Sequence, residues 1–577
     1  MPDVTVRLAK HTRELAIGSA VLAVALLLAS RPTRAQTVSP SQVTPPTLRP
    51  PQPPPQLPFI PEESPPQERL HTLPVNVEVR YVVVENGFAA LADDTQDLLA
   101  PYRNRRISGE EIFALARELE QTYARHGYVL VRVIVPPQTV ANGDVLRLRV
   151  VDGFIQEVDA DAVPKRLRAA VLRRLSPLVG RHHLLLATLE RHLLVAGELA
   201  GLHLTSALAP GSQQGGTRLL IGGAYRALGG AVSADDRLDP TLGPWEVDAN
   251  LTLNSALAFG EQLYGDVLFS DPLKMFGSAP LKVYGGGAVI PVGNDGTTIN
   301  PEYTYSTTRS PAASGVPATE GKFQRIALRG ALGLRWRRRE VLKLNLSAEA
   351  IDQRLEASAF GSDLYHDQYR VLRLGLNDDS LLAGGARLIS DATLSRGLGG
   401  RTPTEASPVP LSRQGAAPEF TKLNASVRLS EPVTHGWQLD AIALGATSFG
   451  KPLLRSEQFS LDGLDALSAF TPGSLSVDQG ATVRAELGRP IALRWGGASG
   501  VLSPYLVAAY GLGEIQMPTA VEQHCIHAST FGAGVRASAA AAGGTSAQFA
   551  LEVARQQANL EGIHDGWRVN LIVGLRF

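Results

Sequence analysis

A strict alternation of apolar and polar residues decides the fold of this chain, and residues 245–254, WEVDANLTLN, show it most clearly. Five apolar residues alternate there with five polar ones, so an extended strand carries the two kinds on opposite surfaces. The same period of two returns over 342–350 and again over 567–577, which closes on Phe577. From about residue 223 onward we therefore expect strands and turns.

Two architectures use such strands in opposite ways. A soluble β-sandwich buries the apolar face, whereas a membrane barrel turns it to lipid and its polar face to a wet lumen. Residues 223–577 are far too many for one sandwich of roughly 100 residues, and a closing strand with an aromatic end suits a barrel. All five tryptophans also fall in this region, as aromatic girdles require: Trp245, Trp336, Trp437, Trp495 and Trp567. The sequence favours a barrel over 223–577.

The composition excludes several classes of protein. The 577 residues include 55 Lys plus Arg, 55 Asp plus Glu and one cysteine, Cys525. A disulfide framework and a multi-cysteine zinc site are excluded, and Cys525 is most simply an isolated side chain. The balanced charge argues against a nucleic-acid binder. An average hydropathy near zero does not distinguish apolar cores from apolar surfaces that face lipid.

The N-terminal region is typical of an exported protein. Residues 1–35 join a basic start to an apolar run over 15–30 and a small-x-small site at 33–35, which predicts a signal peptide. A membrane anchor is the alternative, but the run falls short of the roughly 20 residues that span a bilayer. Residues 36–72 are rich in proline and predict an extended linker, in which we see no clear amphipathic helix that could plug a pore.

Residues 73–157 and 158–222 are predicted to form two tandem α+β modules. In the first, Ser108 and Glu111 have capping-box spacing ahead of a helix, and Gly127 supplies a left-handed stop. Strands are expected there over 75–84, 128–135 and 145–151. In the second module we expect helices over 164–175 and 189–199 and strands over 201–209 and 218–222.

Several short motifs resemble one known family. They include LAPY at 99–102, a motif with Tyr123, Gly127 and Tyr128 (YARHGY, 123–128), Pro136 and Pro137 in VPPQ at 135–138, VVDG at 150–153, LLRSEQFSLDG at 453–463 and VRAEL at 483–487. In their order and spacing they resemble the two-partner-secretion transporters of the ShlB, FhaC and HecB type.

The resemblance implies a mostly β protein: two α+β POTRA domains before a C-terminal sixteen-stranded antiparallel transmembrane barrel with a long sixth loop at about 455–482. Such a protein sits in the outer membrane of a Gram-negative bacterium, with its POTRA domains in the periplasm. It captures an unfolded secreted exoprotein and passes it through the barrel without nucleotide hydrolysis. Outer-membrane lipid, lipopolysaccharide and the barrel-assembly machinery are the other expected partners. No nucleic acid, cofactor, metal or catalytic residue is implied.

Two motifs depart from the family pattern. The loop tip, Val-Arg-Gly-Phe or Val-Arg-Gly-Tyr in the family, reads Leu467, Ser468, Ala469, Phe470 here. Its barrel-wall partner, Phe-x-Asp-x-Gly, becomes Val507, Ala509 and Gly511 at the motif positions. Both charged partners are missing, which is self-consistent because the loss of one alone would strand a charge in the lumen. Either apolar packing around Leu467 and Phe470 holds the tip, or the loop is mobile and export is poor or absent.

Other motifs do not indicate an enzyme. Residues 445–452 nearly match a phosphate-binding loop, but Pro452 stands where a hydroxyl must bind magnesium. His182, His183 and His192 are close in sequence but lack fixed acidic or thiol partners, so surface and helix-packing histidines are favoured over a metal site. The alternatives left open are a barrel-assembly relative, a diffusion porin, a soluble β-rich binding protein and a non-exporting homologue.

Overall fold

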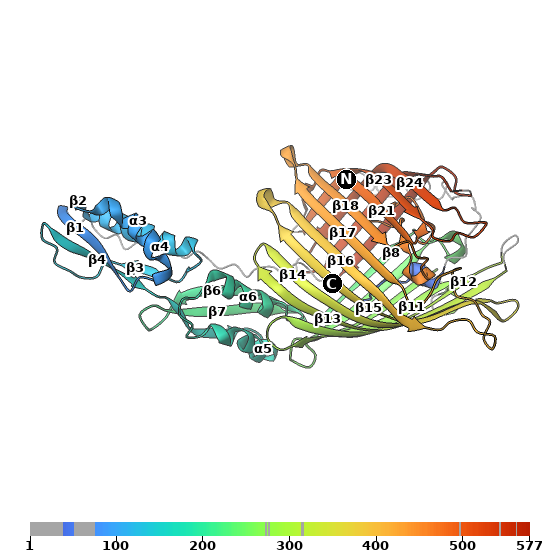
Figure 1. The fold of residues 1–577 in the computed structure, drawn as a ribbon, viewed down its shortest axis with the longest axis horizontal. Helices are drawn as coiled ribbons and strands as arrows, with labels where there is room; N and C mark the ends of the chain where they lie inside the picture. Colours follow the sequence, from blue (N-terminus) through green and yellow to red (C-terminus); the bar gives the residue numbers. More distant parts are fainter. Residues whose placement is uncertain are drawn as a thin grey trace, which may run out of the picture.

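The computed structural model describes residues 39–50 and 76–577, apart from residues 272–273, 275–276, 313–316, 496–497, 542–543 and 561. Two small α+β modules form one arm of the molecule, and a large β-barrel forms the other (Figure 1). The predicted signal 1–35 and residues 51–72 of the predicted linker lie outside the described residues. Within the described part, no helix is long and apolar enough to cross a membrane.

The first module is a four-stranded sheet in the order β2-β1-β4-β3, in which β1 and β4 run parallel. The expected capping box is present, because Ser108 Oγ accepts from Glu111 N at 3.2 Å and Glu111 Oε2 accepts from Ser108 N at 2.8 Å. Gly127 has a φ of 92° and stops the helix as expected. The elements are β1 (Asn76–Glu85), α3 (Ala92–Leu99), β2 (Arg105–Ser108), α4 (Gly109–Arg125), β3 (Arg132–Ile134) and β4 (Asp144–Val151).

The second module is a three-stranded sheet in the order β5-β7-β6. Its elements are β5 (Phe154–Ala162), α5 (Lys165–Leu175), α6 (Leu186–Gly197), β6 (Leu202–Pro210) and β7 (Gly216–Tyr225). Strand β5 was not expected from the sequence, and it begins inside the range assigned to the first module. The strand carries an acidic residue at every second position from Glu157 to Asp161, and acidic residues are depleted in strands. The sequence therefore does not resemble a strand here. Here Arg218 pairs with Asp159 at 3.1 Å and also with Glu157.

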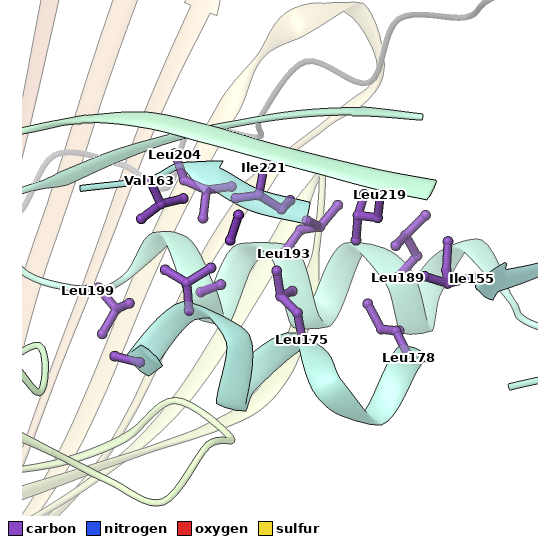
Figure 2. Close-up of a cluster of buried hydrophobic side chains, with 14 of the residues drawn as sticks. Ile155, Val163, Leu175, Leu178, Leu189, Leu193, Leu199, Leu204, Leu219 and Ile221 are labelled. Carbon is purple, nitrogen blue, oxygen red and sulfur yellow. The ribbon is translucent and has the colours of Figure 1, made fainter. Parts of the chain in front are cut away.

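Leucines from both helices fill the core of the second module. Leu175 from α5 and Leu189 and Leu193 from α6 point toward Ile155 and Leu219 of the sheet (Figure 2). All five side chains are fully buried. Burial of a leucine or isoleucine side chain contributes about 1.5–3 kcal/mol, so this cluster stabilises the module despite its short sheet.

The barrel is a closed antiparallel sheet of sixteen strands, in which β22 continues β21 along the same neighbour, β23. It closes where β26 pairs with β8, and Phe577 N donates to Gly230 O at 3.0 Å at the end of this seam. The strands are β8 (Leu228–Asp235), β9 (Glu246–Asn254), β10 (Gln262–Ser270), β11 (Leu281–Val292), β12 (Thr297–Ser310), β13 (Thr319–Arg337), β14 (Glu340–Ala357), β15 (Ser362–Leu381), β16 (Arg387–Gly400), β17 (Thr421–Pro432), β18 (Gln438–Thr447), β21 (Gln479–Gly488), β22 (Ile491–Trp495), β23 (Ala498–Glu514), β24 (Cys525–Ala540), β25 (Ser546–Ala558) and β26 (Gly566–Arg576).

The structure also contains several short helices, strands and turns. A one-turn helix, α2 (Pro40–Val43), and a two-residue pair, β19 (Phe459–Ser460) with β20 (Ser476–Val477), lie outside the modules and the barrel wall. Short 3-10 turns are η1 (Ala89–Leu91), η2 (Ala100–Tyr102), η3 (Ser176–Leu178), η4 (Pro240–Leu242), η6 (Ala383–Gly385), η7 (Thr434–Gly436) and η8 (Arg455–Glu457).

The alternating pattern places apolar residues outside and polar residues inside. In β9, Leu251 and Leu253 are 48% and 43% exposed, whereas Thr252 and Asn254 are buried. This confirms the barrel and not the sandwich, because a sandwich would bury the leucines. The prediction that the tryptophans lie in aromatic girdles is wrong for Trp336. Its side chain is only 3% exposed and contacts the second module, so it does not face lipid.

The second module docks against the near end of the barrel. Leu194 and Val195 of α6 pack on Trp336 and Val341, which flank the short β13–β14 turn. Lys343 adds an ion pair to Glu198 at 3.3 Å and lies 4.8 Å from the centre of the Trp336 ring. This contact fixes the module at the mouth of the barrel.

Candidate functional site: a barrel lumen occupied by two segments

The lumen is occupied by loop 6, which we define as residues 448–478 between β18 and β21. It is the sixth connection at the barrel end opposite the modules, and it overlaps the expected range 455–482. Its tip, Leu467 to Phe470, is at most 3% exposed and contacts the inner wall. The loop therefore folds back into the barrel.

A buried polar network holds the tip. Arg484 of β21 donates from Nη1 to Ser468 Oγ at 2.7 Å and from Nη2 to Glu552 Oε2 of β25 at 2.7 Å. Ser468 Oγ also donates to Glu552 Oε1, and Asn570 of β26 donates to the Ser468 carbonyl at 2.8 Å. Tyr505 of β23 donates to Glu552 at 2.9 Å. We call Arg484, Tyr505, Glu552 and Asn570 the tip socket; the Arg484 side chain is 1% exposed.

Apolar contacts surround this network. Leu467 and Phe470 form one buried cluster with Ala509 of the wall. A Cβ atom at Gly511 would lie 3.0 Å from Leu467 Cδ1, so glycine leaves room for the tip. The structure thus brings the predicted tip and the predicted wall motif together, with Val507, Ala509 and Gly511 all on the buried inner side.

The missing family charges are replaced, not merely lost. The family pattern predicts that position 468 meets position 509, but the structure places Ser468 against Arg484 and Glu552 instead. The arginine sits on the wall, and the loop contributes a hydroxyl that bonds both charged groups. Because a buried ion pair with satisfied hydrogen bonds resists separation, the tip has a strong attachment without an arginine of its own.

A second attachment lies earlier in loop 6. Glu457 of η8 is buried and accepts from Arg373 Nη2 at 2.6 Å and from Tyr369 OH at 2.8 Å, both on β15. Lys422 of β17 pairs with the same carboxylate at 3.1 Å. Further along, Asp462 accepts from the backbone N–H of Leu475 at 2.7 Å, which ties the two limbs of the loop together.

Residues 39–50 are the second segment in the lumen; they appear as the short blue piece within the barrel (Figure 1). Ser39 bonds Tyr365 of β15 at 2.7 Å. Thr47 Oγ1 and Leu48 N both donate to Glu302 Oε2 of β12, at 2.7 and 3.1 Å. We call residues 39–50 the N-terminal segment.

Glycines of the wall make room for this segment. A Cβ atom at Gly285 would lie 2.1 Å from Leu48 Cδ1, and one at Gly321 would lie 2.4 Å from Pro40 Cγ. The prediction of an extended linker over 36–72 is therefore wrong for residues 39–50, which pack inside the pore. A single turn of helix is too short to show a hydrophobic period, so no pattern in the sequence indicates it.

The two segments touch each other. Gln42 Nε2 donates to Ser476 Oγ at 2.8 Å and to Gly473 O at 3.4 Å, both in loop 6. A Cβ atom at Gly473 would lie 3.0 Å from Gln42 Cβ. Movement of either segment therefore disturbs the other.

The predicted motif residues of the first module serve its packing. Tyr123 is fully buried, and its hydroxyl accepts from Phe88 N at 3.0 Å. Its ring and that of Tyr128 both meet Phe88 edge-on. Pro136 and Pro137 follow the edge strand β3, where proline blocks further pairing. Tyr123 and Tyr128 therefore pack in the module, and the two prolines end its edge strand.

The three histidines noted in the sequence do not converge. His182 Nδ1 and His183 N contact the Asp152 carboxylate at 3.0 and 3.2 Å. His192 instead bonds the carbonyl of Arg174 at 2.9 Å, and burial lowers its pKa. His182 and His183 are thus exposed, and His192 alone packs between the two helices of the second module.

Sequence reasoning missed the tip socket. Arg484 and Glu486 stand on the polar face of VRAEL at 483–487, and Glu552 stands on that of β25. Charges of opposite sign on the inner faces of two strands were the available signal. Their pairing could not be found, because β21 and β25 are not neighbours in the sheet and no local pattern links Arg484 to Glu552.

Comparisons with known proteins agree with this architecture. A family model described as "POTRA domain, ShlB-type" matches residues 77–153, and one described as "Haemolysin secretion/activation protein ShlB/FhaC/HecB" matches residues 223–537. The hemolysin transporter protein HpmB of Proteus mirabilis is 22% identical over 435 residues, which is 74% of each chain.

Solved structures share the fold. CdiB from Escherichia coli has a TM-score of 0.67 at 18% identity and covers 94% of both chains. CdiB from Acinetobacter baumannii has a TM-score of 0.59 at 14% identity, covering 99% of this chain and 98% of that one. With more than half of its residues matched by the second family model, the chain belongs to the ShlB/FhaC/HecB family of two-partner-secretion proteins, which are outer-membrane transporters and not enzymes.

Proposed function

We propose that this transporter exports an unfolded partner protein through its lumen after loop 6 and the N-terminal segment have both left it. The observation that carries the proposal is the occupied lumen, since two hydrogen-bonded segments fill the space that an extended chain would need. A diffusion porin would keep that space open for small solutes. No nucleotide is required, because folding of the client outside biases its movement.

The client is captured in the periplasm along β6, the edge strand of the second module. Strand β6 pairs with β7 on one side, and the described residues place no strand on its other side. Its unpaired N–H and C=O groups offer an extended client a strand to pair with. A cavity of about 520 Å³ beside it, lined in part by Thr205, Ala207 and Leu220, would take client side chains.

The position of β6 suits delivery into the barrel. Leu202 starts the strand two residues after Ala200, whose N–H donates to Gly260 O in the β9–β10 turn at 3.4 Å. A client paired along β6 therefore lies at the mouth of the lumen. Pairing through the backbone holds many sequences weakly, which allows the client to be handed on.

The client that we propose is a large secreted exoprotein. The relatives include a hemolysin transporter and, over 33% of this chain, a heme/hemopexin transporter from Haemophilus influenzae. We also propose that residues 1–35 direct export, that lipopolysaccharide and outer-membrane lipid surround the barrel, and that the barrel-assembly machinery inserts it. A gene for a long exoprotein beside the gene for this transporter would support this choice of client.

Photo-crosslinking tests the capture step. A photoreactive residue at Thr205 or His203, both exposed on β6, is expected to crosslink the client during export. Ala169, exposed on α5, is the matched control and should give no crosslink. Deletion of either module should stop export while the barrel still assembles. Export that continues without both modules would refute the proposal.

A further inference from the structure

Three metal-binding side chains meet at the far end of β23 and β24. Glu514 ends β23 and lies directly opposite Cys525, which begins β24. Residues opposite each other in an antiparallel pair project to the same face, and His524 precedes Cys525. One ligand atom from each of the three lies within 4.8 Å of the others. Both His524 and Cys525 are exposed at the barrel end that faces away from the modules.

Neighbouring groups already orient these ligands. His524 Nδ1 lies 2.8 Å from the carbonyl of Ile515. A carbonyl only accepts, so Nδ1 carries the proton and the lone pair is on Nε2. Histidines that bind metals almost always have such a partner on the other ring nitrogen.

The carboxylate is held in a similar way. Glu514 Oε2 accepts from Gln479 Nε2 at 2.8 Å and from Gln516 Nε2 at 3.3 Å. Two amides on one oxygen leave Oε1 as the atom for a cation. Cys525 is held by its place in the ladder and by Asn559, whose amide donates to the Cys525 carbonyl at 3.0 Å.

We propose that Glu514, His524 and Cys525 bind Zn²⁺ at the outer rim of the barrel. A thiolate, a neutral imidazole and a carboxylate are the ligands that zinc takes, and three of them leave a fourth position for water. Calcium and magnesium prefer oxygen ligands alone, so the thiol and imidazole select against the cations that are common near lipopolysaccharide.

The site adjoins the point where loop 6 rejoins the barrel. Gln479 is the first residue of β21, and the backbone N–H of Gln516 donates to Asp478 of loop 6 at 2.7 Å. A bound ion would therefore brace the β23–β24 turn against the end of loop 6. The binding itself does not depend on the export mechanism.

Cys525 makes the test direct because it is the only cysteine in the chain. The full-length protein, purified in detergent and treated with a chelator, is alkylated with a maleimide with and without Zn²⁺. Zinc should slow the reaction strongly, and Mg²⁺ at the same concentration should not. Co²⁺ in place of Zn²⁺ should give a thiolate-to-metal charge-transfer band that is absent from Cys525→Ser.

Variants test the ligand set by isothermal titration with Zn²⁺ alone. His524→Ala, Glu514→Gln and Cys525→Ser should each abolish tight binding, and Gln479→Ala should weaken it by about 10–100-fold as an orienting partner does. His527→Ala is the matched control, an exposed histidine on the same strand, and should bind normally. Equal alkylation rates with and without Zn²⁺, or full affinity in Cys525→Ser, would overturn the proposal.

Discussion

Loop 6 and the N-terminal segment occupy the same lumen but are held by different chemistry. The tip of loop 6 is bonded by Arg484 and Glu552, two charged wall residues with almost no exposure. The N-terminal segment is held by separate hydroxyl and backbone hydrogen bonds, several of them to the charged wall residues Glu302, Arg325 and Arg329, and by apolar packing. Removal of one partner of a buried ion pair costs about 3–5 kcal/mol, whereas a single hydrogen bond to a charged group contributes about 1.5–3 kcal/mol.

This difference in attachment predicts the order in which the two segments leave the lumen. The N-terminal segment should leave first, because its separate contacts can be lost one at a time. The loop tip should leave last, because its network stays intact until both charges are separated from Ser468. Gln42, which bonds loop 6, allows the first departure to weaken the second.

Removal of the socket arginine should have the largest effect. Arg484→Met leaves Glu552 without its cation and removes a donor to Ser468, so the closed position of loop 6 should lose about 3–5 kcal/mol. Single-channel recordings in a planar bilayer should show much larger and more frequent openings than the wild type.

Arg387→Met is the matched control for that variant. Arg387 of β16 bonds Asp379 on the neighbouring strand β15 at 2.8 Å, and none of its bonds reaches loop 6. Its recordings should stay close to wild type. If the two variants open equally, the socket is not what holds the loop.

The second-largest effect on channel opening is expected when the positive charge is moved from the wall to the loop. Ser468→Arg alone sets a second guanidinium against Arg484, with a repulsion of up to about 4 kcal/mol at 4 Å and an effective dielectric of about 20, partly offset by Glu552 and Glu486. The loop should open more often. Combined with Arg484→Ser, the same Ser468→Arg should close it again, since one arginine then faces Glu552. A double variant that stays as open as Arg484→Ser would contradict this arrangement.

Weakening the N-terminal segment should have a moderate effect. Glu302→Gln removes a charged acceptor from Thr47 and Leu48, and hydrogen bonds to charged groups contribute about 1.5–3 kcal/mol. With Cys525→Ser and Ser41→Cys as the background, maleimide labelling of residue 41 should become faster. Glu340→Gln is the control, because Glu340 pairs with Arg335 and its bonds do not reach residues 39–50 or loop 6. Equal labelling in both variants would show that Glu302 does not hold the segment.

The fold was predictable from the sequence, whereas most of the lumen was not. The period of two in residues 245–254 and the capping box at Ser108 are local signals, and both appear in the structure as expected. The tip position came from the resemblance to the family and not from a local pattern, and the structure packs Leu467 and Phe470 against Ala509 of the wall. The Arg484–Glu552 pair joins residues 68 positions apart in the sequence. Helix and strand periodicity relate only residues that are close in sequence, so they cannot predict this pair.

The smallest expected effect tests whether the two segments are coupled. Gln42→Ala removes the hydrogen bonds to Ser476 and Gly473, which are neutral and contribute about 0.5–1.5 kcal/mol each. The single variant should raise the opening frequency only slightly. In Arg484→Met, where loop 6 is already loose, Gln42→Ala should add less than it does alone, because the contact that it removes is no longer made. Strict additivity in this double-mutant cycle would show that the segments leave independently, and the proposed order of release would then rest on their separate wall contacts alone.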